Sequence, residues 1–169
     1  MSAHGLSHEF DSTVLLFFLA SDFMALDKLK KTVFWTISRT GLFFYARFPI
    51  FGPLNAAIGI LRQDATYLVI ERNDGRGLSF PGGLLHPWEG ADQAVIREVL
   101  EETGLKVSKS VLRSSYYSSA DIPVNVTVFD IEAQGQLRGS WEGRPSWLPV
   151  SDLRERIIPA QRRIVDMLL

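Results

Sequence analysis

The sequence predicts an α/β domain that follows a helical extension, and three observations lead to this prediction. Residues 1–52 are rich in aromatic side chains at helical spacing, until two prolines interrupt the pattern in FPIFGP, residues 48–53. From residue 53 onward, strand-like and helix-like stretches alternate, with glycine and proline between them. Hydrophobic residues make up 46% of the chain, so it can bury a core. We therefore expect an extension at residues 1–52 and a main domain at residues 53–169.

The extension has two interpretations. Residues 28–47 interleave Lys and Arg with aromatic side chains, and a basic amphipathic stretch can lie on a membrane surface. The alternative, which we favour, is one or two helices that pack on the main domain or on the second subunit of a homodimer. The apolar run at residues 14–20 is much shorter than the ~20 residues of a membrane span. The acidic residues before this run are untypical of a secretory signal.

Charge and composition exclude several classes of protein. The net charge of -1 predicts no general attraction to nucleic acid. The chain has no cysteine, which excludes disulfides and thiolate metal sites. We therefore expect a cytoplasmic protein.

The main domain opens with strand signals. Residues 55–62 and 67–72 predict two strands that a tight turn joins into a hairpin. The segment NDGRG, residues 73–77, predicts a loop. In LSFPGGLL, residues 78–85, we expect a short strand that bends sharply at Pro81-Gly82-Gly83.

A helix is predicted next, from about Glu89 to Thr103, with Gly104 at the place of a left-handed C-cap. The later predicted elements are strands at 114–119, 124–133 and 145–150 and helices at 151–157 and 159–169. Ser151 is a suitable N-cap for the first of these two helices, and Pro159 is suited to begin the second.

The helix after Glu89 carries a run of carboxylates. At ~100° per residue, Glu98, Glu101 and Glu102 fall on one face, with the small residues Ala91 and Ala94 on the same arc. The bulky side chains that we expect to pack into the domain are Val95, Ile96, Val99 and Leu100. Like charges at helical spacing repel each other, and a hard divalent cation such as Mg²⁺ or Mn²⁺ would reverse that penalty. The alternative is a solvated acidic face.

The residues around the carboxylates fit a metal site. Gly82 and Gly83 allow the backbone to turn tightly and to come close to a ligand, and a carbonyl in that turn could add an oxygen ligand. Arg97 lies beside the acidic face, where it could pair with Glu101 or with Glu89 and orient a carboxylate.

Residues 83–105 read GLLHPWEGADQAVIREVLEETGL, which resembles the Nudix box G-x5-E-x7-R-E-U-x-E-E-x-G-U, with U a bulky aliphatic residue. The resemblance implies an α/β/α sandwich with a mixed sheet and hydrolysis of a nucleoside diphosphate linked to another moiety, X. It also implies a set of site residues. The metal ligands would be Glu98, Glu101 and Glu102 with the Gly82 carbonyl, and the supporting residues would be Gly83, Glu89 and Arg97.

Downstream segments resemble MutT-type members of this superfamily. In EGRPSW, residues 142–147, Glu142 would be a metal ligand or the general base, and the alternative is an ordinary loop glutamate. In IPAQRR, residues 158–163, Gln161 would contact the nucleobase, although glutamine replaces the usual asparagine. Arg72 could contact a substrate phosphate, and the alternative is a surface arginine.

These observations favour a Mg²⁺- or Mn²⁺-dependent pyrophosphohydrolase of nucleotide-type small molecules. The MutT-like segments favour (d)NTP substrates, and the alternative is an ADP-ribose or nucleotide-sugar pyrophosphatase. A nucleotide sensor with the same fold and no turnover is a further alternative, although such proteins usually lose box glutamates that this chain keeps.

Overall fold

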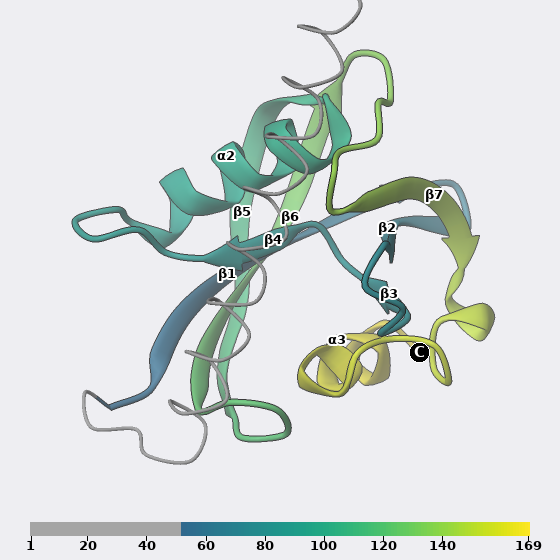
Figure 1. Ribbon diagram of the computed structural model, residues 1–169. Coiled ribbons are helices and arrows are strands. Elements are labelled where there is room, and N and C mark those ends of the chain that lie inside the picture. The colour runs from purple at the N-terminus through teal and green to yellow at the C-terminus, as the bar shows by residue number, and fades with distance from the viewer. Residues whose placement is uncertain (1–51) are drawn as a thin grey trace, which may run out of the picture. The chain divides into compact units, whose positions relative to one another are not determined.

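Seven strands and two α-helices form the part of the chain that this computed structural model describes, residues 52–169 (Figure 1). The strands are β1 (Leu54–Gln63), β2 (Thr66–Arg72), β3 (Leu78–Ser79), β4 (Gly82–Leu84), β5 (Lys106–Ser118), β6 (Val124–Gln134) and β7 (Gly143–Pro149). The α-helices are α2 (Ala91–Thr103) and α3 (Arg162–Leu168), and 3-10 helices cover Val150–Asp152 and Pro159–Gln161. The predicted extension lies outside the described residues except for Gly52, so its helices and the division at residue 52 stay predictions. Within residues 52–169, no helix combines the length and the apolar character that crossing a membrane requires.

The strands form a mixed sheet around β1. This strand pairs in parallel with β6 and antiparallel with β2 and β4. The other pairs are antiparallel: β2 with β3 and β7, and β5 with β6. The main path through the sheet runs β3-β2-β1-β6-β5.

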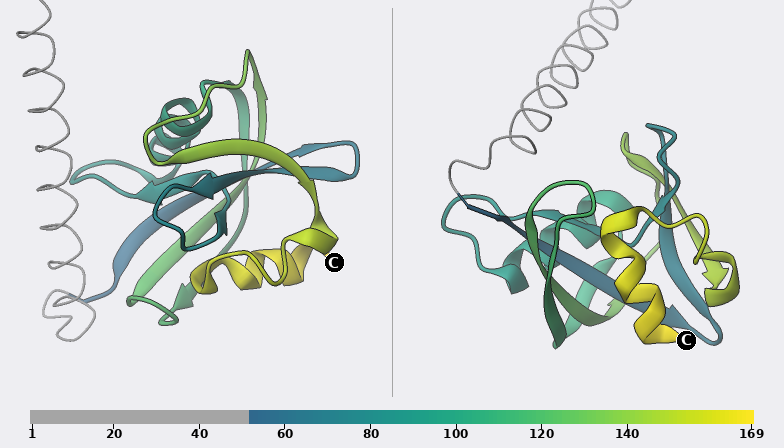
Figure 2. Two further views of the ribbon diagram at one scale, coloured as in Figure 1. Left: turned by 45° about the vertical axis from the view of Figure 1, so that its right-hand side comes forward. Right: turned by 90° about the horizontal axis from the view of Figure 1, so that it is seen from below.

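The two α-helices cover opposite faces of this sheet (Figures 1 and 2). Because successive side chains of a strand point to opposite faces, β1 contributes to two separate cores. Ala57 and Leu61 belong to the core on the α2 side. Ile58 and Ile60 belong to the core that includes buried residues of α3. The helix–sheet–helix layering confirms the predicted α/β/α sandwich with a mixed sheet.

Gly59 lets α2 lie close to the sheet. A Cβ atom at this position of β1 would come within 3.1–3.2 Å of side-chain atoms of Val95, Val99 and Ile131. Such separations are tighter than ordinary van der Waals contact, so the packing of α2 on the sheet depends on the missing side chain. The glutamates of α2 are therefore held near the strands.

Most of the predicted elements are present, with shifted ends. The helix begins at Ala91 and leaves Glu89 in the preceding loop, while Gly104 is its left-handed C-cap with φ 74°. The strand predicted at 114–119 begins at Lys106. β5 pairs only with β6 among the described strands and is largely exposed, so its first half lacks the apolar alternation that sequence analysis detects.

The helix predicted at 151–157 is wrong. Only the 3-10 turn Val150–Asp152 forms, and the Ser151 hydroxyl bonds to Asp152 and does not cap a helix. The reason is that the backbone of Leu78 forms hydrogen bonds with the end of this segment. The N–H of Leu78 donates to the carbonyl of Arg156 at 2.8 Å, and the N–H of Ile158 donates to the Leu78 carbonyl at 2.9 Å. The last predicted helix does begin at Pro159, first as a 3-10 turn and then as α3.

Candidate active site

The orientation of α2 differs from the one expected. Val95 and Val99 are buried against the sheet as predicted, but Ile96 and Leu100 are exposed. Ala94, expected to leave space beside the carboxylates, is fully buried in the core on the α2 side. The helix is therefore rotated so that part of its acidic face points toward the sheet.

The three glutamates consequently occupy different environments. Glu102 is 3% exposed, the side chain of Glu98 is 12% exposed, and that of Glu101 is 60% exposed. Within residues 52–169 no three acidic or histidine side chains are arranged so that they could hold a metal ion as they stand. The predicted ligand role of these glutamates stays a prediction.

Glu102 is the buried centre of the site. Its Oε2 accepts a hydrogen bond of 2.9 Å from the N–H of Gly82, and its carboxyl shares a hydrogen bond with that of Glu142. Burial is the largest cause that raises the pKa of Glu102, to about 9, and the nearby carboxylates of Glu142 and Glu98 raise it further. A cation at this point would replace the proton that Glu102 otherwise keeps at neutral pH.

The structure brings Glu142 from a distant segment to Glu102. Glu142 belongs to the loop 139–143, which we call the Glu142 loop and which precedes and enters β7. Its backbone carbonyl accepts a hydrogen bond of 2.9 Å from the N–H of Asn73, and the carboxylate also acts electrostatically on Glu98. Glu142 is therefore placed beside the glutamates of α2, and its role as ligand or base stays a prediction.

The glycine turn lies directly against the sheet and the carboxylates. Gly82 has φ 150°, and a Cβ there would collide with the carbonyl oxygen of Ala57. A Cβ on Gly83 would collide with the carboxylate of Glu98. The turn therefore approaches β1 and Glu98 as closely as only glycine allows.

Arg97 forms hydrogen bonds with three carboxylates, one in the loop before α2 and two on the helix. Its Nε and Nη2 donate to the two oxygens of Glu89 at 2.9 Å each, and its Nη1 donates to Glu98 at 2.7 Å and to Glu101 at 3.4 Å. These bonds include both predicted pairings. The bidentate contact lowers the pKa of Glu89 to about 2, and the same bond raises the pKa of Arg97. On Glu98, burial raises the pKa against the lowering effect of Arg97.

Arg72 lies at the end of β2, near Glu102 and Glu142, and its guanidinium is hydrogen-bonded to Asp74. Nε of Arg72 donates to the two Asp74 oxygens at 3.1 and 3.2 Å, and Nη2 donates at 2.6 Å. This bond is the largest cause that raises the pKa of Arg72, with smaller effects from Glu102 and Glu142. Asp74 was not predicted, although an acidic residue two positions after an arginine at a strand end could have signalled it.

Gln161 takes a position that sequence reasoning did not foresee. It is 4% exposed, and its Oε1 accepts a hydrogen bond of 2.7 Å from the N–H of Phe80. The amide oxygen is thus engaged inside the protein, two residues before Gly82. The predicted nucleobase contact stays a prediction.

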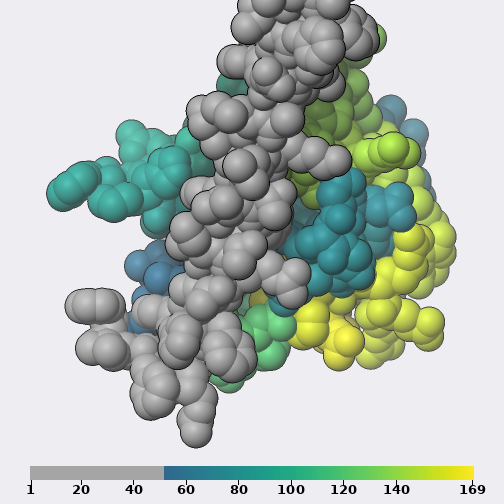
Figure 3. All heavy atoms as spheres, in the orientation of Figure 1, coloured from purple at the N-terminus to yellow at the C-terminus, as the bar shows by residue number. Residues whose placement is uncertain are grey.

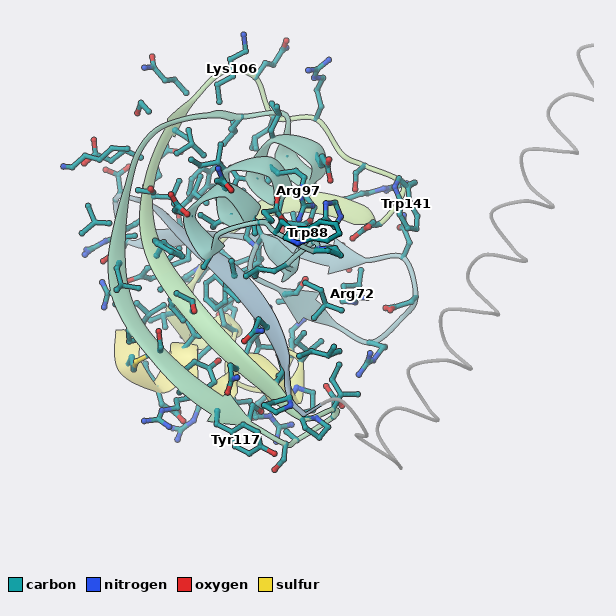
Figure 4. All side chains as sticks on the ribbon, turned by 90° about the vertical axis from the view of Figure 1, so that its left-hand side faces the viewer. Arg72, Trp88, Arg97, Lys106, Tyr117 and Trp141 are labelled. Carbon is teal, nitrogen blue, oxygen red and sulfur yellow. The ribbon has the colours of Figure 1, made fainter. Side chains whose placement is uncertain are left out.

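Two tryptophans near the site were also missed. Trp88 is fully exposed with φ 66°, in the loop before Glu89, and Trp141 is half exposed beside Glu142. In Figure 4, Trp88, Arg97, Trp141 and Arg72 lie in one region of the view. An exposed aromatic residue next to a motif residue is the signal that could have marked Trp88 and Trp141.

The comparisons with known proteins agree with this fold. The family model described as the NUDIX domain matches residues 53–168. A MutT-like protein of Streptomyces ambofaciens is 32% identical over 112 residues, which cover 64% of this chain and 72% of that protein. YtkD of Bacillus subtilis (strain 168), named provisionally as an 8-oxo-dGTP diphosphatase, is 48% identical over 48 residues. That match covers 28% of this chain and spans only 30% of YtkD's own length.

A solved structure shows the same fold. The MutT NUDIX hydrolase from Burkholderia pseudomallei superposes with a TM-score of 0.62 at 20% identity, covering 69% of this chain and 98% of that one. Nudix hydrolases act on nucleotide-type small molecules and generally need divalent cations. The family model covers more than half of the chain, and the mixed sheet between two helical layers agrees with it. This chain therefore belongs to the Nudix family and is a Nudix hydrolase.

Proposed function

We propose that this Nudix hydrolase uses a divalent cation to cleave the diphosphate linkage of a nucleoside diphosphate linked to X, with (d)NTP-type molecules as the favoured substrates. The observation that carries the proposal is the meeting of the buried Glu102 with the partly exposed Glu142, with Glu98 and Arg72 beside them. A pyrophosphate repels a nucleophile, so a site for its hydrolysis must collect positive charge around the phosphate oxygens.

The side chains in this region fit Mg²⁺ or Mn²⁺ by their chemistry. The donors are hard oxygens, and burial together with the nearby carboxylates of Glu142 and Glu98 raises the pKa of Glu102. The ion would be held by Glu98, Glu101, Glu102, Glu142 and the Gly82 carbonyl. When bound, it would withdraw charge from the phosphate oxygens and make the attacking water more acidic.

The other side chains would act on substrate and water. Arg72, oriented by Asp74, would donate to a phosphate oxygen through Nη1, since Asp74 occupies Nε and Nη2. A carboxylate, Glu142 or one of the α2 glutamates, would take the proton of the water that attacks phosphorus. Arg97 and Glu89 would keep the turn and α2 in register through their bidentate pair. The products would be a mononucleotide and the phosphate ester of X, which for a triphosphate substrate is pyrophosphate.

The name of one relative supports triphosphate substrates. The matched proteins include the MutT-like protein and YtkD, the latter named for oxidised dGTP. Gln161 would read the base through its amide nitrogen, because its oxygen already accepts from the N–H of Phe80. The cytoplasmic location and the role of residues 1–52 stay predictions.

The test is a substrate panel with Mg²⁺, Mn²⁺ or EDTA, in which phosphate and pyrophosphate release are read separately. The panel holds the dNTPs, oxidised dGTP, ADP-ribose, a nucleotide sugar and a dinucleotide. Pyrophosphate release from a triphosphate, abolished by EDTA, is the expected result. Cleavage of ADP-ribose-like compounds alone would reject (d)NTP-type molecules as the substrates, but it would remain consistent with the proposed metal site. No turnover at all would favour the nucleotide sensor.

Two variants test the assignment of the carboxylates. Glu102→Gln keeps the size of the side chain and should lower kcat by orders of magnitude without unfolding the protein. Glu132→Gln is the matched control, because Glu132 is an exposed glutamate of β6 whose ion pair is with Lys109. Full activity of Glu102→Gln would contradict the metal assignment.

A further inference from the structure

We propose that Asn73 is a positioning residue that holds the Glu142 loop so that the Glu142 carboxylate meets Glu102. This inference rests on the function proposed above for Glu142. It adds a residue of the β2–β3 loop to the site, outside the three segments that resemble known motifs.

Asn73 binds the Glu142 loop at two consecutive residues. Its backbone N–H donates to the carbonyl of Glu142 at 2.9 Å, and its Nδ2 donates to the carbonyl of Trp141 at 2.9 Å. The side-chain bond joins residues that are 68 positions apart in the chain. In Figure 3, the surfaces of the β2–β3 loop and of the segment before β7 adjoin each other. The β2–β3 loop therefore supports the chain directly under the Glu142 side chain.

The Glu142 loop leaves the regular strand pairing just before β7. The β2–β7 ladder ends at the pair Arg72–Gly143, so Glu142 lies one residue beyond the regular strand pairing. Within the loop, the Ser140 hydroxyl accepts from the N–H of Glu142 at 3.1 Å, and the Ser140 N–H donates to the Gly143 carbonyl at 3.1 Å. These bonds shape the loop locally. The two bonds of Asn73 join the loop at Trp141 and Glu142 to the residue that follows β2.

The attachment matters because the loop brings the negatively charged carboxylate of Glu142 close to other carboxylates. Glu142 acts electrostatically on Glu98, and like charges repel at short range. A loop without a fixed anchor would relieve this repulsion by moving away from α2. Asn73 bonds only to backbone carbonyls of the loop, so it can oppose this movement without neutralising Glu142.

The consequence for catalysis is a loss of positioning. A displacement of about 1 Å in a catalytic group can cost ~10²-fold in rate. We therefore expect Asn73→Ala to lower kcat by about tenfold or more, with KM within about twofold of the original. If Asn73 acts through Glu142, its substitution should lower kcat only while Glu142 is present. Asn73→Ala in the Glu142→Gln background should therefore lower kcat by less than about twofold.

The experiment is this double-mutant cycle, measured as metal-dependent hydrolysis of the best substrate of the panel. Asn73→Asp is the second variant, because it keeps the shape of the side chain and removes the Nδ2 donor. Asn125→Ala is the matched control: Asn125 Nδ2 donates at 3.2 Å to the exposed Asn55 on neighbouring β1, and its removal should leave kcat unchanged. Thermal unfolding of every variant shows that each one folds.

A second measurement does not depend on turnover. Amide hydrogen exchange of the metal-free protein should become faster in the Glu142 loop of Asn73→Ala and Asn73→Asp, while the amides of α2 keep their protection. Unchanged exchange in this loop would overturn the inference even for a protein whose substrate is unknown.

The outcomes separate this inference from the function on which it rests. If Glu142→Gln hydrolyses as fast as the original protein, the role of Glu142 is wrong and the inference falls with it. If Glu142→Gln is impaired while Asn73→Ala is not, only the inference is wrong. An equal loss from Asn73→Ala in both backgrounds would also overturn it, because Asn73 would then act independently of Glu142.

Discussion

Without a cation, Glu102 should make the protein less stable as the pH rises. The pKa of its carboxyl is raised from 4.5 to about 9, with burial as the largest cause. Because the pKa is higher in the folded state, the stabilisation is fully present below about pH 4.5, where the group is protonated in both states. It is lost as the pH rises toward about 9. At about 1.4 kcal/mol for each pKa unit, the full change corresponds to roughly 6 kcal/mol, comparable with the whole stability of many domains.

The assay is urea unfolding of the EDTA-treated protein and of Glu102→Gln between about pH 6 and 8. Across this range, the free energy of unfolding of the original protein should fall relative to the variant by about 1 kcal/mol for each pH unit. The amide of the variant does not titrate, so the variant reports every other group. Mg²⁺ should flatten the slope of the original protein, because a bound cation favours the ionised carboxylate. Parallel curves for the two proteins in EDTA would refute the reasoning.

Three further substitutions probe the contacts around the site. Asp74→Asn removes the charge that orients Arg72 and should raise KM about tenfold, the equivalent of one charge-assisted hydrogen bond; steady-state kinetics measures it. Gly59→Ala places a methyl group against α2 and should lower the free energy of unfolding by about 1–3 kcal/mol, as read from urea titrations. Gly83→Ala forces the Glu98 carboxylate to move and should lower kcat by about tenfold or more, measured with saturating Mg²⁺.

Each of these predictions has a result that contradicts it. Asp130→Asn is the control for Asp74→Asn, because Asp130 pairs with Nε of Arg113 at 2.9 Å on the exposed sheet. Equal KM values for the two variants would show that Asp74 does not act on the substrate. Unchanged stability of Gly59→Ala would mean that α2 can move outward freely. Unchanged kcat of Gly83→Ala would show that the close approach of the glycine turn to Glu98 does not affect catalysis.

Features set by neighbours in the chain could be predicted from the sequence. The hairpin, the carboxylate helix and its left-handed glycine cap follow from local periodicity and turn residues. Arg97 could be paired with Glu101 in advance, because i,i+4 spacing on a helix brings them to one side. Its pairing with Glu89 was also predicted, although Glu89 proves to lie in the loop before the helix. The rotation of α2 could not be predicted. Val95 and Ile96 are equally apolar, and only the sheet decides which of them is inside.

Features set by contacts between distant segments were beyond sequence analysis. The helix expected at 151–157 was lost because Leu78 competes for the backbone of that segment. Asn73 meets the Glu142 loop across 68 positions, and Gln161 meets Phe80 across 81. No periodicity or turn signal encodes such pairs. Glu142 was found only through a resemblance, which gave its neighbours on α2 but not the residues that hold it.

The bond between Gln161 and Phe80 affects how the protein can be shortened or tagged. Gln161 reaches the segment just before Gly82 from the side of α3, while Glu102 reaches Gly82 from the side of α2. Ile164 and Val165 follow Gln161 in the chain and are fully buried. A purification tag fused after the exposed Leu169 leaves these contacts in place. A deletion that begins before Gln161 would remove one contact that supports the glycine turn, so such a fragment would be a poor surrogate for crystallisation or inhibitor screening.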